Sequence, residues 1–287
     1  MVGYIDKTID SVSDYLLWVK ETNISEIKCD GGESISFDND YGYYRGQSYS
    51  EWELKPSILR EPILNEHSLL NKALLRLHND ISFLRTNLGK MIFFQHYGLS
   101  TRLLDVTFNP LVALYMACCE EKKQSFDGVV YCGHNSERSN PQIAELTTKY
   151  VFENEIQQMD FRLQHFAKTE KVCVDLFCQP LFILPPINNP RIEAQNGAFI
   201  MAPLVEKIID DKTVLLYRKD LGDSDFFDKR RAIIKGHNKN NILHELSILG
   251  IDSGTIYTGI EEKLKAIVTE EKWNSSSFEN IQLFRKT

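Results

Sequence analysis

The chain has 287 residues, of which 43% are hydrophobic and 25% charged, and its formal net charge is -7 with a pI near 5.6. This is the composition of a soluble globular protein with enough residues to bury a sizeable core. The negative charge disfavours nucleic acid and anionic membranes as general partners. No apolar run reaches the ~20 residues that a membrane-spanning helix needs, so we expect no contact with the bilayer core.

The six cysteines give no sign of a metal site, because none forms a CxxC pair and no cysteine–histidine spacing matches a zinc module. The first residues lack the basic and apolar regions of a signal peptide. We therefore expect a cytoplasmic protein in a reducing compartment.

In the first half of the chain, helical spacing of apolar residues predicts helices. They cover residues 9–20, 65–91 (with a continuation or a short second helix over 92–97) and 110–121. Short apolar runs predict strands at 41–47 and 128–132, and the polar stretch 21–33 is predicted to be a loop. Gly98 is predicted to end a helix, and Ser100 and Thr101 are predicted to cap the next element of the chain.

In the second half, short apolar runs predict strands at residues 181–184, 198–201 and 214–217. Helices are predicted at 156–166 and 260–268, and a helix pair interrupted near Gly236 is predicted over 230–249. Helices thus cluster early and late around separated short strands. The prediction is an α+β fold, a single mixed domain of short strands with helices packed around them.

Arg45, Gly46 and Gln47 form the first polar motif, at the end of the predicted strand 41–47. A guanidinium offers a fixed fork of donors that suits a phosphate or carboxylate. A glycine beside it lets a ligand, or another stretch of backbone, come close. The alternative is a structural arginine paired with an acid such as Asp105.

The second polar motif runs from Gln95 to Asp105 between apolar residues. His96 titrates near neutrality and can act as an acid, a base or a donor. Arg102 and Asp105 would share one face of a helix and could pair there. Asp105 is then expected to be a buried brace that pairs with Arg102 or Arg45. The alternative for His96 is a core histidine whose hydrogen bonds are satisfied.

The third polar motif is Arg191 to Phe199, in which Gln195 and Gly197 offer an amide beside an accessible backbone. That arrangement suits a polar heterocycle or a ribose, although a turn into an edge strand explains the same residues. Buried polar groups need partners. We therefore predict that residues of the three motifs converge on one cleft: Arg45, Gln95, His96, Thr101, Arg102 and Gln195.

These motifs resemble the FRG domain, a family named for its Phe/Tyr-Arg-Gly motif. The family shows an Arg-Gly strand followed by Trp and Leu-x-Pro-Ser, then a Gln-His-x-Gly-x-x-Thr-Arg-Leu-Leu-Asp run with Asn-Pro after it, and later Arg-Ile-x-Ala-Gln-x-Gly-x-Phe. This chain matches them at 45–60, 95–110 and 191–199. The resemblance implies an FRG-like domain at 43–268, preceded by a helix and loop at 1–42 and followed by a tail at 269–287. Val106 stands where the family commonly has Trp.

Tyr44-Arg45-Gly46 also has a more distant resemblance to ADP-ribosyltransferases, whose first strand often ends in Tyr-Arg and binds the phosphates of NAD. That resemblance implies NAD as the cofactor of a transferase or glycohydrolase. The chain departs from that pattern, because it lacks a recognisable Ser-Thr-Ser strand. It also has Gln195 where a catalytic glutamate is expected, with Glu193 as the nearest substitute.

The candidate site follows from the motifs and the two resemblances. The candidate catalytic residues are His96, Gln195 and Glu193, and no metal ligands are expected. The candidate ligand-binding residues are Arg45, Gly46, Gln47, Gln95, Gly98, Thr101, Arg102, Asp105 and Arg191. The expected partner is a phosphate-bearing small molecule. The chain shows no well-placed catalytic acid, so a non-catalytic nucleotide- or peptide-binding sensor module stays open as the alternative.

Overall fold

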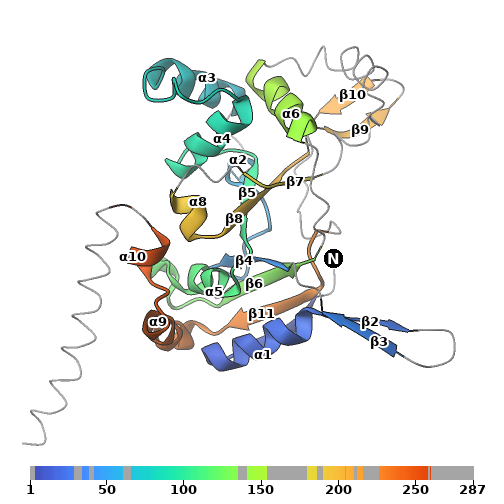
Figure 1. Ribbon diagram of the computed structural model, residues 1–287, viewed down its shortest axis with the longest axis vertical. Coiled ribbons are helices and arrows are strands. Elements are labelled where there is room, and N and C mark those ends of the chain that lie inside the picture. Colours follow the sequence, from blue (N-terminus) through green and yellow to red (C-terminus); the bar gives the residue numbers. More distant parts are fainter. Residues whose placement is uncertain are drawn as a thin grey trace, which may run out of the picture.

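The computed structural model describes residues 4–28, 34–38, 42–60, 66–134, 141–153, 180–185, 190–203, 205–209, 212–215, 226–257 and 259. Within these residues, helices surround a seven-stranded mixed sheet (Figure 1), which confirms the predicted α+β class. In sheet order the strands are β1 (Ile5–Ile9), β11 (Arg230–Ile234), β6 (Gly128–Gly133), β4 (Tyr43–Gln47), β5 (Leu103–Thr107), β8 (Gly197–Met201) and β7 (Leu181–Ile183). Strands β1 and β11 are parallel, and the other neighbours are antiparallel.

Two hairpins lie outside this sheet. They pair β2 (Ile24–Lys28) with β3 (Ser34–Asp38), and β9 (Val205–Ile209) with β10 (Lys212–Leu215). The helices are α1 (Val12–Thr22), α2 (Ser57–Arg60), α3 (Glu66–Arg76), α4 (Asn87–His96), α5 (Pro110–Cys118), α6 (Pro141–Glu153), α8 (Pro190–Ala194), α9 (Lys239–Ile248) and α10 (Ser253–Ile256). None of the helices in the described residues is both long and apolar enough to pass through a membrane.

The sheet divides between β4 and β5. Strand β4 pairs with β6 over its full length, whereas it pairs with β5 only at Tyr44 and Thr107. In Figure 1, β5 and β8 run at a steep angle to β4, β6 and β11. The strands therefore diverge at the point where the first two polar motifs meet, which leaves backbone groups there for side chains to bind.

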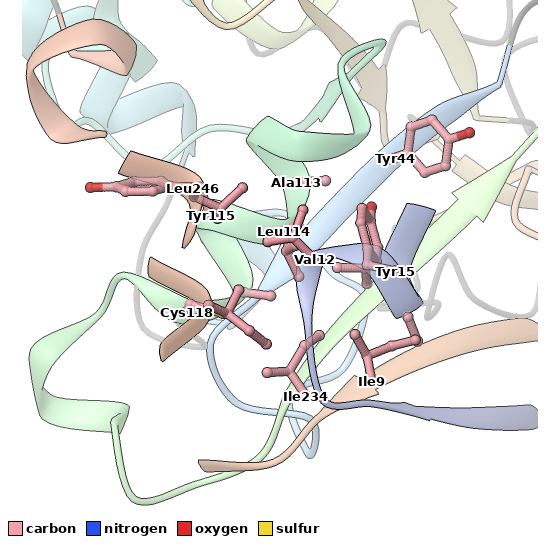
Figure 2. Packing of buried hydrophobic residues seen from close by; sticks show 14 of the residues in the cluster. Ile9, Val12, Tyr15, Tyr44, Ala113, Leu114, Tyr115, Cys118, Ile234 and Leu246 are labelled. Carbon is pink, nitrogen blue, oxygen red and sulfur yellow. The ribbon is translucent and has the colours of Figure 1, made fainter. Parts of the chain in front are cut away.

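One hydrophobic core lies between α1, α5, α9 and the face of the sheet that carries Tyr44 (Figure 2). Helix α5 is apolar all round and almost wholly buried, as expected for a helix covered on every side. It begins where the sequence predicts, since Pro110 occupies its first turn and the side chain of Asn109 accepts a hydrogen bond from the Leu111 N–H. It ends at Cys118, before the predicted Glu121.

A second core packs α3, α4 and α6 against β5, β7 and β8. A third covers the opposite face of the sheet, where Tyr43, Val129 and Tyr131 lie on β4 and β6. Side chains alternate along a strand, so Tyr43, Arg45 and Gln47 share one face of β4, while Tyr44 and Gly46 share the other.

Several predicted elements are wrong. The predicted helix 65–91 is two helices, α3 and α4, because Thr86 caps a new helix start; Leu77 and Leu84 keep the apolar spacing by packing on the same core. Residues 230–234 of the predicted helix pair form strand β11. Only its last three residues, 232–234, are apolar and buried, and spacing alone does not distinguish so short a run from a helix. The predicted loop 21–33 contains β2. The sequence did not predict β1, β3, α2, α6, α8, β9 or α10. The predicted helices 156–166 and 260–268 lie outside the described residues.

Candidate functional site

Gly46 is required by helix packing. A Cβ atom built on Gly46 would lie 1.9 Å from the carbonyl oxygen of Ala113, in α5. The sequence predicted that either a ligand or another stretch of backbone comes close to Gly46. The structure shows the backbone of α5 there. Gly46 therefore sets how closely α5 crosses β4, and so helps to fix the strand from which Arg45 projects.

The side chain of Arg45 connects β4 to β5 where these two strands diverge. Its Nη1 donates to the backbone carbonyl of Asp105 at 2.8 Å and lies 3.8 Å from the Asp105 carboxylate. Its side chain is 18% exposed, and its buried Nε has no hydrogen-bond partner in the part of the chain that the structure describes. Burial lowers the pKa of Arg45 to about 10, partly offset by Asp105, and the nearby Arg60 lowers it further. The guanidinium stays charged at neutral pH, with donor capacity to spare.

Asp105 is held by a short chain of hydrogen bonds. Its Oδ1 accepts from the amide nitrogen of Gln95 at 2.9 Å, and the Gln95 amide oxygen accepts from the hydroxyl of Thr101. Thr101 is fully buried, and its Oγ1 in turn accepts from the Leu103 N–H at 3.2 Å. The Asp105 side chain is nevertheless 55% exposed. The prediction of a buried brace is therefore wrong on burial, although the predicted proximity to Arg45 holds.

Arg102 does not pair with Asp105. Residues 102–105 lead into and form strand β5 instead of a helix, and positions three apart on a strand point to opposite faces. Arg102 is buried and pairs with Glu66, through Nε at 2.8 Å and Nη2 at 2.6 Å, and its Nη1 donates to the Pro203 carbonyl. Glu66 also accepts from the Arg102 backbone N–H. These bonds engage each nitrogen of the Arg102 guanidinium, so this arginine is structural.

His96 lies at the end of α4, beside Asp105 and Arg191. Its ring meets Phe199 edge-on with centroids 6.0 Å apart, and its buried Nε2 has no hydrogen-bond partner among the described residues. Burial lowers the pKa of His96; Asp105 opposes this shift and Arg191 adds to it. The imidazole is therefore held in its neutral form near pH 7, able to accept or donate one hydrogen bond through Nε2.

Arg191 joins α8 to this group. Its Nη1 donates to the backbone carbonyl of His96 at 3.2 Å, and its guanidinium lies over the ring of Tyr257, 4.9 Å from the centroid. On the same helix Glu193 is exposed. Gln195, just after α8, accepts at its backbone carbonyl from the Thr107 hydroxyl and donates through Nε2 to the Ile256 carbonyl at 3.5 Å.

Two further residues have local roles. Gly98 has a φ of 91° and follows α4; its N–H donates to the Gln95 carbonyl, and the Leu99 N–H donates to the Phe94 carbonyl. This is the Schellman end of a helix, as the sequence predicts for Gly98. Ser100 and Thr101 cap no helix, because a strand follows them.

Gln47, the last residue of β4, makes two side-chain hydrogen bonds. It donates to the Trp52 carbonyl and accepts from Arg60 at 3.1 Å.

The structure thus links part of the candidate set. We refer to Arg45, Gln95, His96, Thr101, Asp105 and Arg191 as the Arg45–Asp105 cluster, because contacts or direct electrostatic interactions connect each to the next. Gln195 reaches β5 at Thr107, two residues along the strand from Asp105. Arg102 pairs with Glu66 instead, and Gly46 lies against α5.

Three residues near the cluster were not in the candidate set. Arg60 lies near Arg45, over the ring of Trp52, and Tyr257 lies under Arg191; Glu66 pairs with Arg102. Trp52 and Arg60 lie within the segment 45–60 that matches the first part of the family pattern, whereas nothing in the sequence pointed to Glu66 or Tyr257. In the described part of the chain, no group of three or more His, Cys, Asp or Glu side chains is placed to hold a metal ion.

Comparison with known proteins agrees with the first two motifs. No curated protein and no solved structure matches the chain. The family model of the FRG domain matches residues 41–125, a segment that begins beside β4 and ends after η1 (Glu121–Lys123). This segment contains Arg45, Gln95, His96, Thr101 and Asp105, whereas Arg191 lies beyond it. On this match, the segment 41–125 of the chain is similar to an FRG domain.

Proposed function

We propose that this chain is an FRG domain-containing protein that binds a phosphate-bearing nucleotide of the NAD type at the Arg45–Asp105 cluster. The observation that carries the proposal is the state of Arg45, a largely buried guanidinium with one close hydrogen bond and a buried Nε that has no partner in the described residues. A buried donor without an acceptor costs about 1–3 kcal/mol, which an anionic ligand would recover.

The charges around Arg45 support an anion more than a cation. Arg60 is near enough to lower the pKa of Arg45, and Arg191 interacts with His96 in the same cluster. In the described part of the cluster the opposing charge is Asp105, which is half-exposed. Guanidinium groups bind phosphate through paired, charge-assisted hydrogen bonds. A diphosphate placed between these arginines would fit this balance of charge.

The reaction class that the cluster supports best is a transferase or glycohydrolase that uses the nucleotide. His96, which is neutral near pH 7, would act through its Nε2, which has no partner in the described residues. Gln195, whose backbone carbonyl accepts from Thr107, would orient the ligand. Glu193 is exposed on α8. A catalytic acid is usually buried, because burial keeps its carboxyl protonated, so the structure does not favour Glu193 in this role.

A sensor that binds the nucleotide without turning it over is the second candidate. It is favoured by one observation: Asp105, the carboxylate of the cluster, is already held by Gln95 and lies near Arg45. Its Oδ1 therefore accepts a hydrogen bond from the protein itself, which suits a group that holds a ligand more than a group that transfers a proton.

One experiment tests the proposal and separates these two candidates. The melting temperature of the full chain is measured with NAD, ADP-ribose, ATP and buffer, and nicotinamide release from NAD is followed in parallel. A ligand at about a hundred times its dissociation constant stabilises a protein by ~2.7 kcal/mol, so a clear rise is expected with NAD or ADP-ribose. Release of nicotinamide indicates the enzyme, and a rise without release indicates the sensor. No rise with any nucleotide would contradict the proposed function.

A further inference from the structure

Asp105 is an exposed carboxylate whose position is fixed by hydrogen bonds to less exposed residues. Its side chain is 55% exposed, yet Gln95 and the fully buried Thr101 fix it in place. A carboxylate that served only as a structural brace would be expected to share the burial of its partners. This combination of rigidity and access is what a ligand-contacting group requires.

The direction of each of these hydrogen bonds is determined. Asp105 Oδ1 can only accept when ionised, so the amide nitrogen of Gln95 lies toward it and the amide oxygen of Gln95 lies toward Thr101. The Thr101 hydroxyl therefore donates to that oxygen, while its Oγ1 accepts from the Leu103 N–H. The backbone of β5 thus orients a glutamine, and the glutamine orients the carboxylate.

Arg45 does not explain this arrangement. Its Nη1 is 2.8 Å from the backbone carbonyl of Asp105 but 3.8 Å from the carboxylate, so the hydrogen bond is to the backbone. An ion pair this exposed adds little stability, since water screens it. Of the roughly four lone-pair sites of a carboxylate, Gln95 occupies one; the exposure of the side chain leaves others open to solvent.

We infer that Asp105 accepts hydrogen bonds from the sugar hydroxyls of the bound nucleotide, and that Gln95 and Thr101 are its positioning residues. The inference rests on the proposed function. A ligand that contacts both Arg45 and Asp105 must present an anion to the first and a hydrogen-bond donor to the second within a short distance. Phosphate next to ribose meets both demands within one nucleotide, because the carboxylate only accepts and a hydroxyl can donate.

The first test compares sugars. Calorimetric titrations use ADP-ribose and two analogues, each lacking the hydroxyl groups of one of its two riboses, against wild type and Asp105→Ala. For one of the analogues, wild type should bind roughly tenfold or more weakly than it binds ADP-ribose, since a hydrogen bond to a charged group is being lost. In Asp105→Ala that preference should disappear. ADP-ribose and this analogue should then bind the variant with equal affinity, lower than that of wild type for ADP-ribose.

The second test concerns the positioning residues. Gln95→Glu keeps the shape and the oxygen that Thr101 contacts, but it places a second carboxyl against Asp105. Two carboxyls at hydrogen-bond distance share a proton, so the pKa of the pair rises. At low pH the protonated new carboxyl donates to Asp105 as the amide does, and the preference for the intact ribose is kept. As pH rises through the raised pKa, repulsion displaces Asp105 and the preference is lost. Gln95→Met should lack the preference at every pH.

The outcomes separate this inference from the function on which it rests. If ADP-ribose and both analogues bind wild type equally, while Arg45→Lys still weakens all three, the nucleotide site stands and the role of Asp105 is refuted. A preference for the intact ribose that survives in Asp105→Ala refutes it as well. If none of the three ligands binds wild type, both the inference and the proposed function fail.

Discussion

Gly46→Ala is expected to lower the stability of the fold strongly. The added methyl carbon would lie 1.9 Å from the Ala113 carbonyl oxygen and 2.8 Å from the Ala117 nitrogen, both backbone atoms of α5. Neither atom can rotate away, so the whole buried helix must move off β4. Overpacking of a core by one methyl typically costs about 1–3 kcal/mol, and we expect ~3 kcal/mol or more here because the clash is with backbone. Circular dichroism with thermal melting measures the effect.

Gly197→Ala is the matched control. Gly197 also lies on a strand of the same sheet, but the nearest atom to a Cβ built there is the Ile192 carbonyl oxygen at 3.6 Å, an ordinary contact. This variant should fold, with a change in stability within about 1 kcal/mol. A Gly46→Ala protein that melts at the wild-type temperature would show that α5 does not pack against β4 as described.

Glu66→Gln is expected to cost ~3–5 kcal/mol in the free energy of unfolding, because it removes one charge of a buried pair and leaves Arg102 uncompensated. The side chains of Arg102 and Glu66 are only 4% and 9% exposed, and their closest approach is 2.6 Å. Glu66 also satisfies the backbone N–H of Arg102. Urea denaturation monitored by fluorescence gives the difference.

Glu21→Gln is the matched control, because it removes one charge of an exposed ion pair with nearly the same nitrogen–oxygen distance. Glu21 pairs with Lys7 at 2.7 Å, but these two side chains are 61% and 41% exposed. An exposed pair contributes about 0–1 kcal/mol, so this variant should unfold close to the wild-type midpoint. Similar losses in the two variants would show that burial of the Arg102–Glu66 pair has no energetic consequence.

Elements with local signals were predicted well from the sequence. The start of α5 follows from Asn109 and Pro110, and the end of α4 follows from Gly98, because capping and turn conformation depend on neighbouring residues only. Strands β6 and β8 were predicted from compact apolar runs. By contrast β11 begins with two arginines and has a shorter apolar run, and its place between β1 and β6 makes it a strand.

The site was predictable where its contacts lie close along the chain. Gln95, Thr101 and Asp105 fall within a single motif, and the structure joins them by hydrogen bonds. The partner of Arg102 was not predictable, because Glu66 lies 36 positions away on α3 and only the tertiary fold brings it close. The same holds for Tyr257 and Arg191. A helix was assumed at residues 102–105, so the Arg102–Asp105 pair was wrong.

Arg45 carries the central claim, that the cluster is a site for a phosphate-bearing nucleotide. Lysine keeps the charge of Arg45 but cannot offer two parallel donors, so the exchange removes the paired contact with a phosphate. Loss of such charge-assisted bonds should weaken binding roughly ten- to a hundredfold. Arg76→Lys is the control, since Arg76 is exposed at the end of α3, a helix that packs in the second core.

The most direct measurement is calorimetric titration of ADP-ribose into wild type, Arg45→Lys and Arg76→Lys, after circular dichroism has shown that all three are folded. We expect equal affinities for wild type and Arg76→Lys, and a loss of about tenfold or more for Arg45→Lys. Equal affinities in all three proteins would contradict it, because Arg45 would then lie outside the binding site and the case for a phosphate-bearing ligand would lose its main support.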